Sequence, residues 1–361
     1  MPLLSKYLTR AVITLFFSAT VVQGMAPERR ATVCNGHAEL CEKSYGSVSF
    51  VGAHDSYAIG SRNMITVNQD QSITQQLNDG IRMLQMQAHL EKGEIRLCHT
   101  SCQLFDGGNL QSFLGEVKAW LDANPNEVLS LLIVNIDNVA VAQYDSIFKA
   151  ASLDTISFVP EVSPVPASGW PTLGSMIDSG KRLVTFLDNG AESGSVPYLL
   201  NEFTNVWETA FNVVDPNLFD CTVNRTKGDA ASQMYLINHF LDKLLLGQPI
   251  PDVSKLNVTN AASGSGSLGA HVDACVTLNT RPPNFLLVDF YEFGGGSVFE
   301  VAARLNSVQY NPTTPIASPL STSTSDASTP NNNSAPALSY SYLVASVTVV
   351  ASIVFGAYCL V

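Results

Sequence analysis

The chain has 361 residues, a formal net charge of −12 and no basic cluster. This charge excludes nucleic acid and anionic lipid surfaces as bulk partners, although a local site could still hold one phosphate. Length alone allows two domains, but barrels of alternating strands and helices reach about 250 residues as one domain, so one large core is also compatible.

The amino-terminal segment has the pattern of a secretory signal. Lys6 and Arg10 precede an apolar run over residues 11–22, and Val22-Gln23-Gly24 offers small residues for cleavage. We expect a removed signal peptide at residues 1–24 rather than an anchor, because the run is shorter than the roughly 20 residues that span a bilayer. Residues 25–44 form an N-terminal extension that carries Cys34 and Cys41.

The cysteines indicate an oxidising compartment. Seven become six if the tail with Cys359 is removed, and an even number suits disulfide bonds. The spacings favour three bridges while leaving other pairings open: Cys34–Cys41, Cys98–Cys102 and Cys221–Cys275. No cysteine pair stands at zinc spacing. In a secreted chain, Asn224, Asn257 and Asn332 are glycan acceptors, which predicts a glycoprotein.

Residues 45–310 alternate short apolar runs with helical patterns. Eight runs are candidate strands: residues 48–51, 81–88, 95–98, 128–135, 183–187, 205–209, 235–237 and 285–289. This alternation predicts an α/β fold with a parallel sheet, and eight strands favour a TIM-type (β/α)8 barrel, regular or distorted. The Rossmann alternative lacks a GxGxxG motif after the first strand.

Three helices can be placed between the strands. Residues 72–79 begin with Ser72 and Gln75 in capping-box register and end at Gly80. Residues 110–121 place their apolar side chains on one helical face. Residues 297–305 follow three glycines, with Ser297 and Glu300 again in capping-box register.

The carboxyl-terminal end has the pattern of a glycosylphosphatidylinositol (GPI) signal. A Ser/Thr/Asn/Pro-rich stretch at 311–341 predicts a disordered stalk, and residues 342–361 form an apolar tail without a basic cluster after it. Residues 332–335 are small enough for attachment. The alternative is a transmembrane tail.

Polar residues that end strands are the candidate site, because active sites of such barrels lie at the carboxyl ends of the strands. They are His54, Asp55, Gln87, His89, His99 and Asp289. The first and eighth strands of a closed barrel are neighbours, so Asp289 can reach His54. Two histidines with carboxylates form a general acid and base set, because imidazole titrates near neutral pH.

Five motifs carry a family resemblance: "GAHDSYA" from Gly52, "LNDGIRMLQMQAH" from Leu77, "LCHTSC" from Leu97, "VKAWLDANPNEVLSLLIVN" from Val117 and "FLLVDFYEFGG" from Phe285. In this order they resemble the fungal branch of the phosphatidylinositol-specific phospholipase C X-domain-like phosphodiesterases. The resemblance covers about residues 45–306. It implies that His54 is the general base, His99 the general acid, and that Asp289 and Asp55 support them.

The second strand departs from the family pattern. Bacterial members carry Asp-x-Arg there and metal-dependent relatives carry acidic ligands, whereas this chain has Gln85 and Gln87. An arginine or metal neutralises charge on the phosphoryl oxygens, so we expect no Ca²⁺ or Mg²⁺ and no other cofactor. Protonated His89, on the same strand face, could partly replace the arginine. Alternatively, Gln85, Gln87 and His89 form a neutral hydrogen-bonded layer.

Later strands supply weaker candidates for sugar binding, namely Asp188, Glu208, Asn238 and His239. The glycines at 294–296 could cradle a phosphate, but they also fit a flexible helix cap.

The leading hypothesis is a secreted, GPI-anchored, metal-independent phosphodiesterase that acts as a monomer on a phospholipid or glycolipid headgroup. The alternative is a catalytically weak barrel that binds a lipid headgroup or glycan at the cell surface. A metal-dependent glycerophosphodiesterase or sphingomyelinase D type enzyme would need acidic residues on the second strand.

Overall fold

The computed structural model describes residues 30–192 and 194–321. The predicted signal peptide and hydrophobic tail lie outside this part of the chain. Among the described helices, none combines the length and the apolar character that crossing a bilayer requires.

Eight parallel strands form one curled sheet. They are β1 (Phe50–Ala53), β2 (Met83–Glu91), β5 (Leu129–Asn135), β6 (Leu183–Leu187), β7 (Leu199–Asn201), β8 (Val206–Glu208), β9 (Met234–Asn238) and β12 (Phe285–Val288). Their order is β7-β6-β5-β2-β1-β12-β9-β8. The first and last strands in sequence, β1 and β12, are paired from Phe50↔Phe285 onward. No ladder joins β7 to β8 within the described residues, so this TIM-type barrel is open between them.

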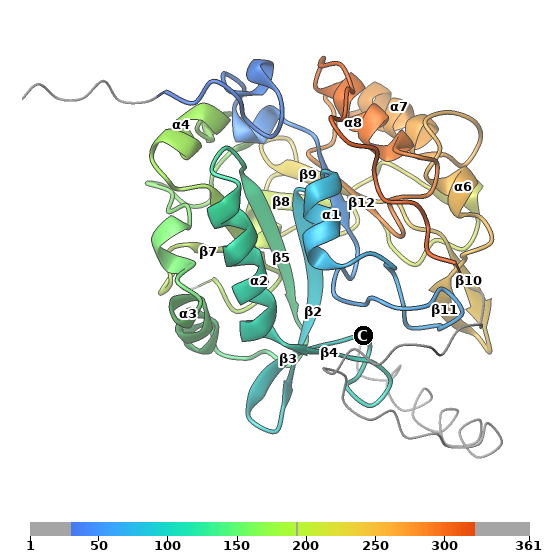
Figure 1. Cartoon of the computed structure of the whole chain (residues 1–361), viewed down its shortest axis with the longest axis horizontal. Coiled ribbons are helices and arrows are strands. Elements are labelled where there is room, and N and C mark those ends of the chain that lie inside the picture. Colours follow the sequence, from blue (N-terminus) through green and yellow to red (C-terminus); the bar gives the residue numbers. More distant parts are fainter. Residues whose placement is uncertain (1–29, 193, 322–361) are drawn as a thin grey trace, which may run out of the picture.

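Helices on the outside of the sheet complete the α/β fold (Figure 1). They are α1 (Ile73–Asp79), α2 (Leu110–Ala123), α3 (Val141–Ala150), α4 (Leu173–Asp178), α5 (Glu202–Asn205), α6 (Leu256–Thr259), α7 (Leu268–Asn279) and α8 (Ser297–Leu305). Helix α1 begins and ends as predicted, because Ser72 accepts from the Gln75 N–H and Gly80 takes a left-handed conformation. The capping box predicted for α8 is wrong: Gly296 precedes the helix with φ of 102°, and the Ser297 hydroxyl donates to the Asn260 carbonyl oxygen instead.

Two hairpins project from the molecule in Figure 1, one at the bottom, where β2 ends, and one at the lower right. In the first, β3 (Glu94–Cys98) pairs antiparallel with β2 and with β4 (Asp106–Asn109). The second consists of β10 (Asp242–Leu245) and β11 (Gln248–Pro251). The prediction of a barrel strand at 95–98 is therefore wrong, because the Lys92-Gly93 turn, with both φ angles positive, folds that segment back on β2. Strand β7, of three residues, was not predicted.

Side chains alternate between the barrel interior and the layer beneath the helices. Phe50, Met83, Phe186 and Phe285 belong to an inner apolar cluster, whereas Val51 and the outward residues of β5 pack against the helices. Gly52 must be small, because a Cβ there would lie 3.0 Å from Leu287 and 3.2 Å from Met83. This inner apolar cluster packs beneath the polar residues at the carboxyl ends of the strands.

All three predicted disulfides are present: Cys34–Cys41, Cys98–Cys102 and Cys221–Cys275. The first part of the segment expected to be a disordered stalk is described by the structure, and its remainder, residues 322–341, lies outside the described residues. Within the described part, Ile316 and Ala317 are half-buried and Ile316 packs on the main core cluster, whereas the other residues of 311–321 are exposed. Three hydrogen bonds, described below, hold this segment.

Candidate active site

The strand period places His54 and Asp289 side by side. Phe50, Gly52 and His54 alternate onto the inner face, as do Phe285, Leu287 and Asp289. Because Gly52 is paired with Leu287, and the His54 N–H donates to the Val288 carbonyl oxygen (2.9 Å), the two strands carry both side chains to the barrel mouth together.

An ion pair fixes the orientation of His54. Its Nδ1 lies 2.9 Å from Asp289 Oδ1, and since a carboxylate only accepts, Nδ1 carries the hydrogen. Buried Asn68 donates through Nδ2 to both Asp289 oxygens (3.1 and 3.2 Å). Burial lowers the pKa of His54, but the charges of Asp289 and Asp55 outweigh it and raise that pKa to about 9.

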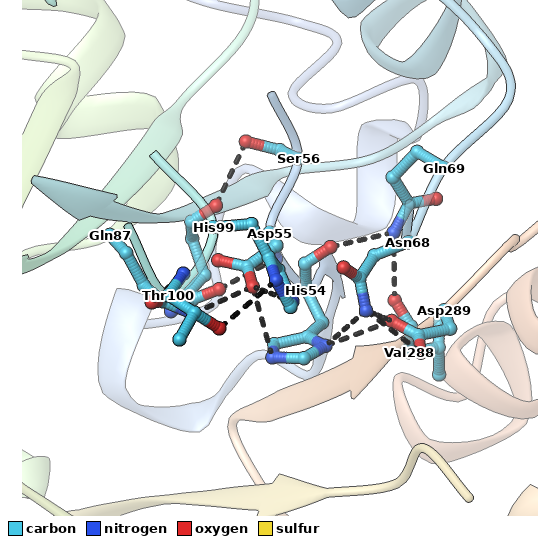
Figure 2. A network of polar contacts seen from close by, with 11 residues as sticks. His54, Asp55, Ser56, Asn68, Gln69, Gln87, His99, Thr100, Val288 and Asp289 are labelled. Atoms are coloured by element: carbon cyan, nitrogen blue, oxygen red, sulfur yellow. Dashed lines mark hydrogen bonds and ion pairs between the residues drawn. The ribbon is translucent and has the colours of Figure 1, made fainter. Parts of the chain in front are cut away.

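Asp55 stands between the two histidines, as Figure 2 shows. Its Oδ2 lies 3.7 Å from His54 Nε2 and 3.3 Å from His99 Nε2, and the side chain is fully buried. The glutamines of β2 hold it there: Gln87 Nε2 donates to Asp55 Oδ2 (2.8 Å), and Gln85 Oε1 accepts from the Asp55 N–H (2.6 Å). One carboxylate thus faces both imidazoles.

His99 sits on a less crowded loop, directly after Cys98 and within the Cys98–Cys102 bridge. Because its Nε2 faces Asp55, Nδ1 is the nitrogen left for a ligand, and it lies 3.4 Å from the Thr100 hydroxyl. Burial lowers the pKa of His99 below its ordinary value, and the charge of Asp55 offsets this only in part.

These residues coincide with a family match. The family model PI-PLC X 1 (PI-PLC_X) matches residues 40–306. The chain belongs to the PI-PLC X domain family.

Two relatives from Arthroderma benhamiae are similar to this chain over about three quarters of its length. A protein named "PI-PLC X domain-containing protein 1" is 43% identical over 76% of the chain and 90% of its own length. An "Uncharacterized secreted protein" is 46% identical over 77% of the chain, which spans 65% of that relative. Among solved structures, a phosphatidylinositol-specific phospholipase C from Listeria monocytogenes is 14% identical, with a TM-score of 0.48, over 73% of this chain and 94% of its own.

Three residues near His54 were not anticipated from the sequence: Asn68, Phe240 and Asp242. The Phe240 ring is stacked on the His54 imidazole, with centroids 3.8 Å apart. Burial, together with the charge of Asp289, raises the pKa of Asp242 to about 7. Phe240 lies two residues beyond Asn238, the last residue of β9, so a period-2 count continued from Leu236 past the strand end would have pointed to it.

The predicted sugar-binding residues occupy several environments. Glu208 pairs with Arg225 and accepts from Asn238 Nδ2 (3.4 Å). Asp188 accepts from the Asn135 N–H (2.8 Å), and burial raises its pKa. His89, expected either to replace the missing arginine or to form a neutral layer with Gln85 and Gln87, has its Nδ1 3.4 Å from Asp137 Oδ2. Asn238 and Glu208 are thus joined, whereas His89 stands with the loop after β5.

The interpretation of His239 as a sugar ligand is wrong. His239 is fully buried, and its Nε2 donates to the Thr259 carbonyl oxygen (2.8 Å). Its Nδ1 faces His271 Nδ1 at 3.0 Å. The side chain therefore belongs to the packing between β9 and α7.

The donor set at the strand ends does not suit a divalent metal. Both ends of the Gln87 amide are engaged, with Asp55 and with the Thr100 N–H (3.3 Å). Within the described residues, one group of three His, Cys, Asp or Glu side chains has converging donor atoms, and it consists of His271 and the disulfide-bonded Cys221 and Cys275. Hard cations prefer several oxygen ligands.

Proposed function

We propose that this protein cleaves the phosphodiester of a phosphoinositide or a glycosylated relative by metal-independent acid and base chemistry. The observation that carries the proposal is the arrangement of His54 and His99 around Asp55, with Asp289 fixing the His54 tautomer. This supplies a proton acceptor and a proton donor at one carboxylate.

In the proposed reaction, His54 Nε2 takes the proton of the inositol 2-hydroxyl as that oxygen attacks phosphorus. His99 gives a proton to the leaving glycerol oxygen. The bond from phosphorus to the glycerol oxygen breaks, and the products are a cyclic inositol phosphate and a diacylglycerol. The reaction leaves the proton on His54, and its transfer to His99 through solvent, when the next substrate binds, restores the reactive arrangement.

The pKa shifts of the two histidines mean that a proton must move between them before the proposed reaction. The pKa of His54 is raised and that of His99 is lowered, so without a ligand one shared proton resides on His54. The proposed cycle needs it on His99. A phosphodiester anion beside His99 favours the protonated imidazole, so substrate binding moves the proton towards the arrangement that reacts.

A leucine-tipped hairpin supports a lipid rather than a soluble substrate. Leu244, Leu245 and Leu246 are 61%, 43% and 78% exposed at the tip of β10–β11. At the base of the same hairpin lie Phe240 and Asp242, next to His54. Exposed apolar patches of this kind mark contact surfaces, and this one ends beside the proposed catalytic base.

The location follows as part of the proposal. The signal-type amino end, the three disulfides and a relative named as secreted support an extracellular protein. The apolar carboxyl end supports a GPI anchor that keeps the barrel near its lipid.

The second candidate function is headgroup binding with little turnover. It is favoured by Gln87, whose amide is engaged with Asp55 and Thr100 and leaves β2 without a charge for the phosphoryl oxygens. A site that lacks such a charge loses several kcal/mol of transition-state stabilisation.

The deciding experiment measures headgroup release from phosphatidylinositol by residues 31–330, secreted and purified, with a chelator present. The control is His54→Ala/His99→Ala. Activity that persists with chelator and disappears in the control supports the phosphodiesterase. A folded protein that releases no more headgroup than its control, yet binds lipid vesicles, supports the second candidate.

A further inference from the structure

The last described segment is held by specific hydrogen bonds rather than by apolar packing alone. The Ala317 N–H donates to Asp79 Oδ2 (3.1 Å), and the Leu320 N–H donates to Asp70 Oδ2 (3.0 Å). The Gln71 amide donates to the Ser318 carbonyl oxygen (3.0 Å). We call residues 316–320 the strap.

The strap contacts the same short loop that holds the proposed catalytic base. At one end of this loop, Asn68 donates to Asp289, and Gln69 Nε2 donates to the carbonyl oxygens of His54 (2.8 Å) and Val288 (3.1 Å). The next two residues are the strap partners Asp70 and Gln71. Four consecutive residues therefore join the strap to the His54–Asp289 pair.

Asp70 makes this loop sensitive to loss of the strap. Its buried carboxylate accepts from the Leu320 N–H and the Arg62 side chain through Oδ2, and it also shares a hydrogen bond with the Glu292 side chain. Nearby Glu292 is also buried; burial and the charge of Asp70 raise its pKa to about 9. Loss of one donor from a buried carboxylate is costly, so undocking of the strap disturbs the loop at this point.

We propose that the strap is a positioning element for His54 and that Asn68 is the positioning residue through which it acts; this rests on the proposed role of His54. A docked strap keeps the loop closed over Asp289 and keeps water out of the His54–Asp289 contact. An undocked strap admits water, which weakens the attraction between the two side chains.

The test uses the full chain with Ala317→Pro/Leu320→Pro, which removes both donating N–H groups. Thr314→Pro, before Pro315 and outside the strap, is the matched control. Asn68→Ala tests the other end of the loop. Three quantities are measured: protection of the strap from a broad-specificity protease, the pKa of His54 by NMR titration of its ring, and kcat and KM on phosphatidylinositol.

We expect the double variant to expose the strap and to lower the pKa of His54 towards its ordinary value. Its kcat should fall roughly tenfold while KM changes less than about twofold. Asn68→Ala should reproduce the pKa and kcat changes with the strap still protected, and combining the variants should add little, because coupled sites are not additive. Thr314→Pro should behave as wild type.

Two outcomes overturn the proposal: a strap that stays protected in the double variant, or an exposed strap with an unchanged His54 pKa. If wild type shows no turnover, the proposed function fails separately, since the titration of His54 still tests the strap.

Discussion

Each half of the site lies beside a hairpin. The two hairpins have the same turn conformation, but one has lysine and the other leucine at its tip. The β2–β3 hairpin, which leads to His99, turns at Lys92-Gly93, and the β10–β11 hairpin beside His54 turns at Leu246-Gly247. Both turns have positive φ angles at both central residues. A leucine is a poor residue for this conformation, which favours Asn, Asp or Gly. Leu246 is nevertheless 78% exposed, so packing of its side chain does not offset this cost.

The two histidines beside these hairpins also differ, in their neighbouring groups and in the direction of their pKa shifts. His54 has three carboxylates, Asp289, Asp55 and Asp242, and a stacked ring around it, and its pKa is raised. His99 has one carboxylate and a hydroxyl nearby, and its pKa is lowered. One residue type therefore holds a proton on one side of Asp55 and releases it on the other, because the number of neighbouring charges differs.

Removal of His54 should have the largest effect. His54→Ala deletes the proposed proton acceptor, and we expect kcat/KM on phosphatidylinositol to fall roughly 1,000-fold, the usual range for a general base. Asp289→Asn should cost less, because the imidazole remains but loses its orienting charge. Steady-state kinetics checks both, and equal loss in the two variants would show that Asp289 does more than orient.

The leaving group separates the roles of the two histidines. His99→Ala should lower turnover of phosphatidylinositol roughly 100-fold, since a glycerol oxygen needs a proton to leave. On an inositol phosphodiester with a p-nitrophenyl leaving group the loss should be below about tenfold, because that group leaves without one. If His54→Ala is the variant rescued by the aryl substrate, the two roles are reversed.

The sequence predicted the frame of the fold because its signals are local. Apolar runs marked most strands, and the Ser72 and Gly80 caps marked α1. It missed the reversal at β3, since a strand pattern does not show whether its partner is parallel, and it missed β7, whose three residues are too short for a period. The closed barrel predicted from eight strands is open between β7 and β8.

In the candidate site, contacts between neighbouring barrel strands were predictable from the sequence, and contacts made by other segments were not. The contact of Asp289 with His54 followed from adjacent barrel strands, and the structure places these atoms 2.9 Å apart. Asn68 comes from a loop and Asp242 from the start of the β10–β11 hairpin, outside the barrel strands, so no barrel-strand period leads to them. The engagement of Gln87 with Asp55 likewise depends on the positive φ of Asp55 (38°), which turns that side chain back over β2.

The hairpin tips offer a matched pair of substitutions. Leu246→Asn should stabilise the protein by about 1 kcal/mol, since Asn tolerates the left-handed conformation better, yet lower vesicle binding several-fold by removing apolar surface. Lys92→Asn at the equivalent turn should stabilise without weakening binding. Thermal unfolding and vesicle sedimentation measure the two effects. Equal binding losses in both variants would remove the distinction between the hairpins.

Asp242→Asn should have the smallest effect. It tests whether a third carboxylate contributes to the raised pKa of His54. The raised pKa of Asp242, about 7, means that its neutral form is favoured in the fold. Stability from this group is full below the unfolded pKa and is lost as pH rises through about 7. The variant, which mimics the neutral form, should therefore match wild type in Tm at about pH 4 and exceed it at about pH 8. The pKa of His54 should fall, because one attracting charge is gone. An unchanged pKa would mean that Asp289 and Asp55 alone hold the proton on His54.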